Sequence, residues 1–186
     1  MNDMPPKSFA PRIRLARRKT GFTLIELLVT IAIGAILMMV AVPNFVAFQR
    51  NAQLSDAVSS FVSAFNVARS NSMKLGVDSY LVPNTGTDWR TGWNVYADTN
   101  FNKSYDAVDD PVVLSAVPVA SSVSVVTATN TIALGYIRFN GSGYPRTKDN
   151  FPGNGSIVMS NGTRSSSIII DNVGRIRSCT TGTTGC

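Results

Sequence analysis

Residues 19–29 read Lys19-Thr20-Gly21-Phe22-Thr23-Leu24-Ile25-Glu26-Leu27-Leu28-Val29, where a basic segment changes into an apolar one. No charged residue occurs from Leu27 to Gln49, which is long enough for a helix of about 20 residues to cross a bilayer. A charge just inside such a run is costly unless it is paired, so Glu26 is predicted to be functional. The sequence therefore predicts a single membrane-spanning helix near the N-terminus that carries one functional carboxylate.

The same helix is predicted to continue beyond Pro43, with a kink there because proline cannot donate a backbone hydrogen bond. Apolar residues then recur at alternating spacings of four and three, at Leu54, Val58, Phe61, Phe65 and Ala68. This spacing places them on one face of a helix that packs on a domain. We expect one helix over residues 22–75, ended by Gly76.

After Gly76 the sequence consists of short β-branched runs separated by Gly, Pro, Asn and Asp, which is typical of strands and turns. The predicted strands are Ser79–Val82, Trp93–Ala97, Ser122–Thr127, Ile132–Phe139 and Ser167–Asp171. Turns are predicted at Asn140-Gly141, Asn154-Gly155 and Asn161-Gly162. Core positions are predicted for the aromatic residues Trp89, Trp93, Tyr96 and Phe139. The predicted fold class is α+β, with a long N-terminal helix packed on an antiparallel β-sheet domain.

Positive charge is concentrated at the two ends of the chain. The formal net charge is +6, and six of the 17 basic residues precede Phe22. Since basic flanks stay cytoplasmic, the C-terminal domain is predicted to lie in the periplasm. There the two cysteines, Cys179 and Cys186, are expected to form a disulfide, the alternative being two unpaired thiols.

The segment from Lys19 to Val29 resembles the type IV prepilin signature. In that family a prepilin peptidase cleaves between the residues that match Gly21 and Phe22 and methylates the new N-terminus. The resemblance implies a leader over residues 1–21, an apolar helix half over 22–49 and a periplasmic domain over 50–186. It also implies that Glu26 neutralises the terminal ammonium of a neighbouring pilin, first in the inner membrane and then in a pilus at the cell surface.

Two further segments, Thr91–Asp98 and Val173–Cys179, resemble the GspH/FimT family. The FimT branch uses a Gly-Arg-x-Arg element to bind double-stranded DNA without sequence preference during natural transformation, which implies this role for Gly174, Arg175 and Arg177. Arginines two residues apart on a strand point the same way and suit phosphate contacts. Other basic residues could extend the surface if the fold brings them near: Arg146, Lys148 and Arg164.

Two alternatives to DNA binding stay open. The arginines could instead pair with carboxylates such as Asp171 or remain solvated on an edge strand. The protein would then be a structural minor pilin that primes pilus assembly, or a GspH-type minor pseudopilin of a type II secretion system.

An Asx-rich loop between Asp98 and Asp109 has oxygen ligands at alternating positions, as calcium loops do. The candidate ligands are Asp98, Asn100, Asn102, Asp106 and Asp109. Lys103 occupies the position that requires glycine, however, so a plain surface loop is the favoured interpretation and no metal is predicted.

The inventory of catalytic side chains is small. The chain has no histidine, no metal-spaced cysteines, no phosphate-binding loop and no nucleophile beside a visible base. We therefore predict that the protein is not an enzyme and has no cofactor.

Overall fold

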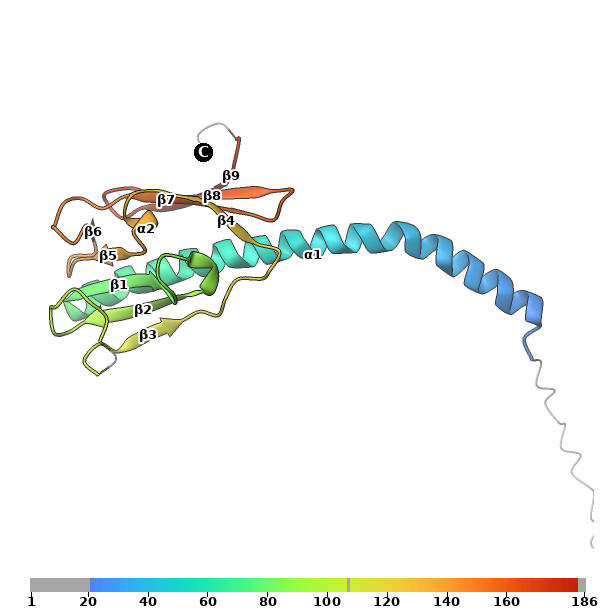
Figure 1. The fold of residues 1–186 in the computed structure, drawn as a ribbon, viewed down its shortest axis with the longest axis horizontal. Coiled ribbons are helices and arrows are strands. Elements are labelled where there is room, and N and C mark those ends of the chain that lie inside the picture. The colour runs from blue at the N-terminus through green and yellow to red at the C-terminus, as the bar shows by residue number, and fades with distance from the viewer. Residues whose placement is uncertain (1–20, 107, 184–186) are drawn as a thin grey trace, which may run out of the picture. The chain divides into compact units, whose positions relative to one another are not determined.

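The computed structural model describes residues 21–106 and 108–183. It divides between Val42 and Pro43 into two compact units. Helix α1 (Leu24–Leu75) contributes to both, and Figure 1 shows it as the longest element of the chain. The helix ends where predicted, because Gly76 takes a φ of +70° and donates its N–H to the Ser72 carbonyl at 2.8 Å.

The first turn of α1 is closed by a reciprocal pair of hydrogen bonds. The Glu26 carboxylate accepts from the Thr23 backbone N–H at 2.9 Å and from the Thr23 hydroxyl at 3.0 Å. The Glu26 N–H in turn donates to the Thr23 hydroxyl oxygen at 3.3 Å. This is a capping box, in which two side chains satisfy backbone groups that the first turn leaves unpaired.

The two parts of α1 differ in what they bury. No side chain from residue 21 to residue 50 is buried, although most of them are apolar. In the second part the predicted face is confirmed, and the buried residues are Leu54, Ala57, Val58, Phe61, Ala64, Phe65, Ala68 and Ser72. By length and composition α1 is able to cross a membrane.

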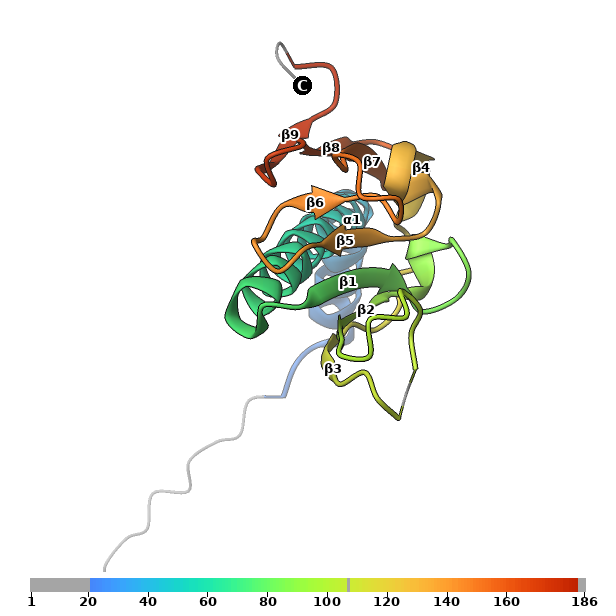
Figure 2. The same cartoon turned by 90° about the vertical axis from the view of Figure 1, so that its left-hand side faces the viewer.

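The domain contains two antiparallel sheets, whose strands lie along the second part of α1 in Figures 1 and 2. The first sheet has the order β3-β2-β1-β5-β6, with the strands β1 (Asp78–Pro83), β2 (Trp93–Asp98), β3 (Val112–Ser115), β5 (Ile137–Phe139) and β6 (Pro145–Arg146). The second has the order β4-β7-β8-β9, with the strands β4 (Ser124–Ala128), β7 (Gly155–Ser160), β8 (Ser165–Ile170) and β9 (Ile176–Thr180). Two short helices, η1 (Trp89–Thr91) and α2 (Asn130–Ala133), complete the domain.

One hydrophobic core joins α1 to both sheets. The Phe61 ring packs edge-to-face on Trp89 and Trp93, with both pairs of ring centroids 5.3 Å apart. Phe65 packs in the same way on Phe139 at 4.8 Å. Tyr96 is also buried, but in a separate cluster with other tyrosines. Its neighbour Val95 belongs to the main core, so alternation along β2 sends Tyr96 to the opposite face of the first sheet.

Three sequence predictions were wrong in detail. The chain turns after Asn140, but the residue with positive φ there is Gly143, at +78°, and not Gly141. The segment predicted as one strand, Ile132–Phe139, contains the end of α2 and a turn at Gly135, whose φ is +79°, before β5 begins. The dipeptide Asn154-Gly155 is not a positive-φ turn, since Gly155 begins β7. A side chain there would meet the Thr129 carbonyl oxygen at 2.8 Å, so close packing explains this glycine.

Candidate functional site

The Gly-Arg-x-Arg element spans the end of the turn between β8 and β9 and the first two residues of β9. Asp171 organises this turn through its carboxylate, which accepts from the backbone N–H of Val173 at 3.1 Å and of Arg175 at 2.8 Å. The Asp171 carbonyl oxygen also accepts from the Gly174 N–H at 3.1 Å. Asp171 therefore does more than offer a charge to the arginines, because it folds the loop that presents them.

Gly174 is required at its position for two independent reasons. Its φ of +81° lies in the left-handed region that side chains disfavour. In addition, a Cβ at Gly174 would lie 3.2 Å from the Gly143 carbonyl oxygen and 3.2 Å from Pro145 Cδ. The turn thus packs closely on the segment that leads into β6.

Arg69 on α1 ties these two segments together, a role the sequence analysis did not identify. Its guanidinium donates to the Gly174 carbonyl at 2.8 Å and to the Gly143 carbonyl at 3.0 Å. Charge-assisted bonds to backbone carbonyls are stronger than neutral ones. The sequence feature that could have indicated this role is the position of Arg69, a cationic residue directly after Ala68 on the helix face predicted to be buried.

Arg175 and Arg177 are exposed and lie together, as the spacing predicted. They line one small hollow of about 110 Å³ with Ile169 and Asp171. Arg175 Nε lies 3.7 Å from an Asp171 carboxylate oxygen, yet 73% of its side chain stays exposed. Within residues 21–106 and 108–183 the Arg177 side chain makes no hydrogen bond or ion pair. Both guanidinium groups are accessible to an anion from solvent.

The other three basic residues do not join this pair. In the first sheet Arg146 pairs with Arg138, and Arg138 pairs with Tyr80. Directly paired residues point to the same face, so the Arg146 side chain lies on the tyrosine face of this sheet. Lys148 lies near another tyrosine, with its Nζ 5.4 Å from the Tyr136 ring centroid. Arg164 immediately precedes β8, at the end of that strand opposite Asp171. The structure therefore brings together only Gly174, Arg175 and Arg177 of the predicted set.

The Asx-rich loop uses its oxygens internally. The Asp98 carboxylate accepts from the backbone N–H of Asn102 at 3.1 Å and of Lys103 at 2.9 Å. Asp110, outside the predicted ligand set, accepts from the backbone N–H of Thr99 and Asp106 at 3.1 and 2.8 Å. Among the described residues no group of three or more His, Cys, Asp or Glu side chains could hold a metal ion. These bonds are those of a structured surface loop.

Three further predictions concern the ends of the chain. Gly21 and Phe22 are exposed at the beginning of the described segment, and Phe22 has 85% of its surface accessible. Cys179 lies in β9, whereas Cys186 lies outside the described residues, so the disulfide stays a prediction. Residues 1–20 of the predicted leader also lie outside the described residues, so the leader stays a prediction.

The chain is similar to proteins of pilin type in sequence and in structure. Residues 57–174 match the family described as "Type II transport protein GspH", and residues 16–42 match the "Prokaryotic N-terminal methylation motif". The type IV major pilin protein PilA of Myxococcus xanthus (strain DK1622) is 32% identical over 119 residues, which cover 60% of this chain. The match spans about half of the length of that relative, 52%.

Two crystal structures of the type IV minor pilin FimU of Pseudomonas aeruginosa (strain PAO1) share the fold. The first has a TM-score of 0.54 and 17% identity, covering 70% of this chain and 90% of FimU. The second has a TM-score of 0.51 and 15% identity, covering 68% and 92%. The predicted α+β pilin-like fold is thus confirmed. Since the family match covers more than half of the sequence and an N-terminal methylation motif precedes it, the chain belongs to the GspH family.

Proposed function

We propose that this protein is a filament subunit whose N-terminal helix anchors and assembles it and whose C-terminal turn binds DNA without sequence preference, for uptake in natural transformation. In this proposal a prepilin peptidase removes residues 1–21 and methylates Phe22. The mature subunit passes from the inner membrane, with its domain in the periplasm, into a pilus of similar subunits.

The apolar first part of α1 supports the assembly half of the proposal. It buries no side chain within the chain, so its stabilisation has to come from lipid or from other subunits. The Glu26 carboxylate would be costly there unless it met a cation, and the methylated ammonium of a neighbouring Phe22 would supply one. Its bond to the Thr23 N–H fits this role, because a carboxylate has lone pairs for several donors.

The observation that carries the DNA half is the fixed presentation of Arg175 and Arg177. The turn is held by Asp171, Gly174 and Arg69, while both guanidinium groups face solvent. Two arginines on one face suit contacts to successive phosphates. For non-specific DNA binding through these few phosphate contacts we expect a dissociation constant of roughly 10⁻⁴ to 10⁻⁶ M at physiological salt. Repetition along a filament would raise the apparent affinity through avidity.

A specific observation also favours a second candidate function. The matched family is described as a type II transport protein, and its match ends at Gly174, before both arginines. In addition, Arg175 has a carboxylate partner in Asp171. Under this alternative the protein is a purely structural subunit, either a minor pilin that primes assembly or a minor pseudopilin of a type II secretion system.

The test measures binding of a fluorescent DNA duplex to the full chain in nonionic detergent across a series of salt concentrations. Arg175→Ala/Arg177→Ala is expected to lose most of the affinity and to reduce the log–log salt slope by about two. Arg50→Ala/Arg90→Ala removes the same charge from α1 and η1 and is the matched control, expected to bind like the wild type. Equal losses in both variants, or no binding at low salt, would leave the structural subunit as the function.

A further inference from the structure

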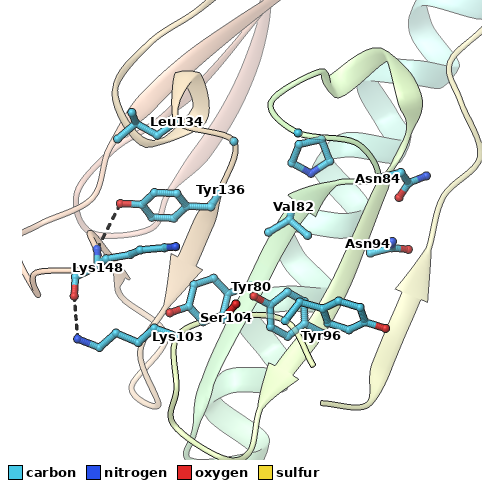
Figure 3. A pocket seen from close by; sticks show the side chains of 14 residues that line it. Tyr80, Val82, Asn84, Asn94, Tyr96, Lys103, Ser104, Leu134, Tyr136 and Lys148 are labelled. Atoms are coloured by element: carbon cyan, nitrogen blue, oxygen red, sulfur yellow. Dashed lines mark hydrogen bonds between the residues drawn. The ribbon is translucent and has the colours of Figure 1, made fainter. Parts of the chain in front are cut away.

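A pocket of about 340 Å³ lies on the face of the first sheet that points away from the main core. Its volume falls in the range of small-molecule sites, about 300–1,000 Å³. Figure 3 shows Tyr136, Lys148 and Lys103 along one side of it, and residues of β1 and β2 such as Tyr80 and Tyr96 along the other. The Gly-Arg-x-Arg turn does not line this pocket, so it is a separate feature of the domain.

Two buried charged residues fix the lysines at the pocket. Asp98, with no exposed surface, accepts from the Lys103 backbone N–H, and Lys103 Nζ donates to the Lys148 carbonyl at 2.9 Å. Arg138, 5% exposed, is paired with Asp78 and donates to the Thr147 carbonyl, next to Lys148. The loop that carries Lys103 and the loop that carries Lys148 are therefore both anchored to buried residues, and the two lysines occupy defined positions.

The charge at the pocket selects the sign of its ligand. Among the described residues no Asp or Glu lines it, while two lysines do. The nearby acids are engaged elsewhere, since Asp98 accepts from backbone amides and Asp78 pairs with Arg138. In the described part of the chain neither lysine forms an ion pair, and Lys148 Nζ faces the Tyr136 ring instead. An anion is the complementary ligand.

The tyrosines at the pocket present few open ring faces. Tyr80 and Tyr96 stack on each other with centroids 5.2 Å apart, and Tyr105 covers Tyr96 at 5.0 Å. The Tyr80 ring is only 1% exposed, and its hydroxyl has no hydrogen-bond partner among the described residues. This hydroxyl is not accessible from solvent, so it does not contribute to ligand binding.

We propose that this pocket binds an acidic saccharide, a sugar unit that carries a carboxylate. The ammonium groups of Lys103 and Lys148 would bind the carboxylate. The Tyr136 hydroxyl, which accepts from the Lys148 N–H at 3.2 Å, would donate to one sugar hydroxyl, and the amide of Asn94 would bind another. A nucleotide fits less well, because base recognition depends on stacking and the tyrosine faces are already covered.

The test uses the full chain in nonionic detergent and ligand-observed NMR with three probes: glucuronic acid, glucose and a nucleoside monophosphate. We expect glucuronic acid to bind and glucose to bind at least tenfold more weakly, because the sugar ring is shared and only the carboxylate differs. Lys103→Gln/Lys148→Gln is expected to reduce glucuronic acid affinity about tenfold or more. Lys74→Gln/Arg50→Gln, on exposed positions of α1, removes the same charge and should leave binding unchanged.

Three results would overturn the proposal. Tighter binding of the nucleotide than of glucuronic acid would assign the pocket to nucleotides. Equal binding of glucose and glucuronic acid would remove the role of the lysines. No saturable binding of glucuronic acid up to 10 mM (about −2.7 kcal/mol by the same affinity scale), with the two tryptophans still protected from quenching as in a folded domain, would exclude the site.

Discussion

Two surfaces of the domain each present a pair of cations, and they differ in how the pair is built. At the β8–β9 turn, Arg175 and Arg177 stand exposed beside a single carboxylate, Asp171. At the pocket, Lys103 and Lys148 are held near buried tyrosines, and no Asp or Glu of the described residues lines it. An open pair suits an extended polyanion whose phosphates are approached from outside. The two lysines are exposed as well, but a pair that lines a pocket suits one small anion whose remaining groups are bonded by neighbours.

The largest expected effect tests the rigidity of the turn. Gly174→Ala places a side chain at a φ of +81° and 3.2 Å from the Gly143 carbonyl oxygen. We expect a loss of about 2–3 kcal/mol in the free energy of unfolding, from backbone strain and overpacking together. Denaturant unfolding followed by the fluorescence of Trp89 and Trp93, both buried, measures it.

Gly162→Ala is the matched control for that substitution. Gly162 has a φ of +88°, but a Cβ there would have no neighbour within 4 Å. It should therefore lose only the strain contribution, about 1 kcal/mol. If both variants lose the same amount, close packing against the β6 segment does not hold the turn.

The second effect tests the enclosure of the pocket. Burial raises the pKa of both Tyr80 and Tyr96, with nearby carboxylates adding to the shift. Below the unfolded pKa of about 10 the phenols are neutral in both states, so their stabilising contribution is complete. Above it the unfolded chain loses protons that the folded chain keeps, and stability falls as pH rises.

Each buried tyrosine should then cost about 1.4 kcal/mol of unfolding free energy at pH 11 relative to pH 8. Tyr80→Phe removes one such contribution together with a buried hydroxyl that has no partner among the described residues. The stability difference between Tyr80→Phe and wild type should shift in favour of the variant by that amount between pH 8 and pH 11. Parallel pH profiles of the two proteins would mean that Tyr80 is not enclosed.

Sequence periodicity predicted the helix well because α1 repeats one pattern over many turns. The face from Leu54 to Ala68 is buried as the spacing of four and three residues required. Periodicity could not predict that Ile132 lies in the short helix α2 and is followed by a turn at Gly135. A short apolar run fits a strand and a buried turn equally well. The strand β3 was also missed, because its residues are partly exposed and show little alternation.

The candidate sites differ in the same way. Arg175 and Arg177 are neighbours in sequence, so strand geometry sufficed to place them together. The pocket combines side chains from β1, β2, the loop after β2 and the segments beside β5 and β6, which only the folded chain brings together. Arg69 shows the same limit, since its carbonyl partners lie 74 and 105 residues away.

The smallest expected effect concerns Asp171. Its substitution tests whether the turn binds anions or whether the Asp171 carboxylate already neutralises Arg175. Asp171→Asn keeps an acceptor oxygen for the N–H groups of Val173 and Arg175 but removes the charge 3.7 Å from Arg175 Nε. An exposed pair contributes up to about 1 kcal/mol, so DNA affinity should rise about two- to threefold at low salt.

The charge-matched control for that substitution is Asp149→Asn, which removes an exposed acid outside the turn and should leave affinity within error of wild type. The gain from Asp171→Asn should shrink as salt is added, because exposed charges are screened over about 10 Å at 0.1 M salt. A loss of affinity in Asp171→Asn would mean that the Asp171 charge orients Arg175 toward DNA. The carboxylate would then be part of the binding surface, and the turn would differ from the pocket, whose lining has none.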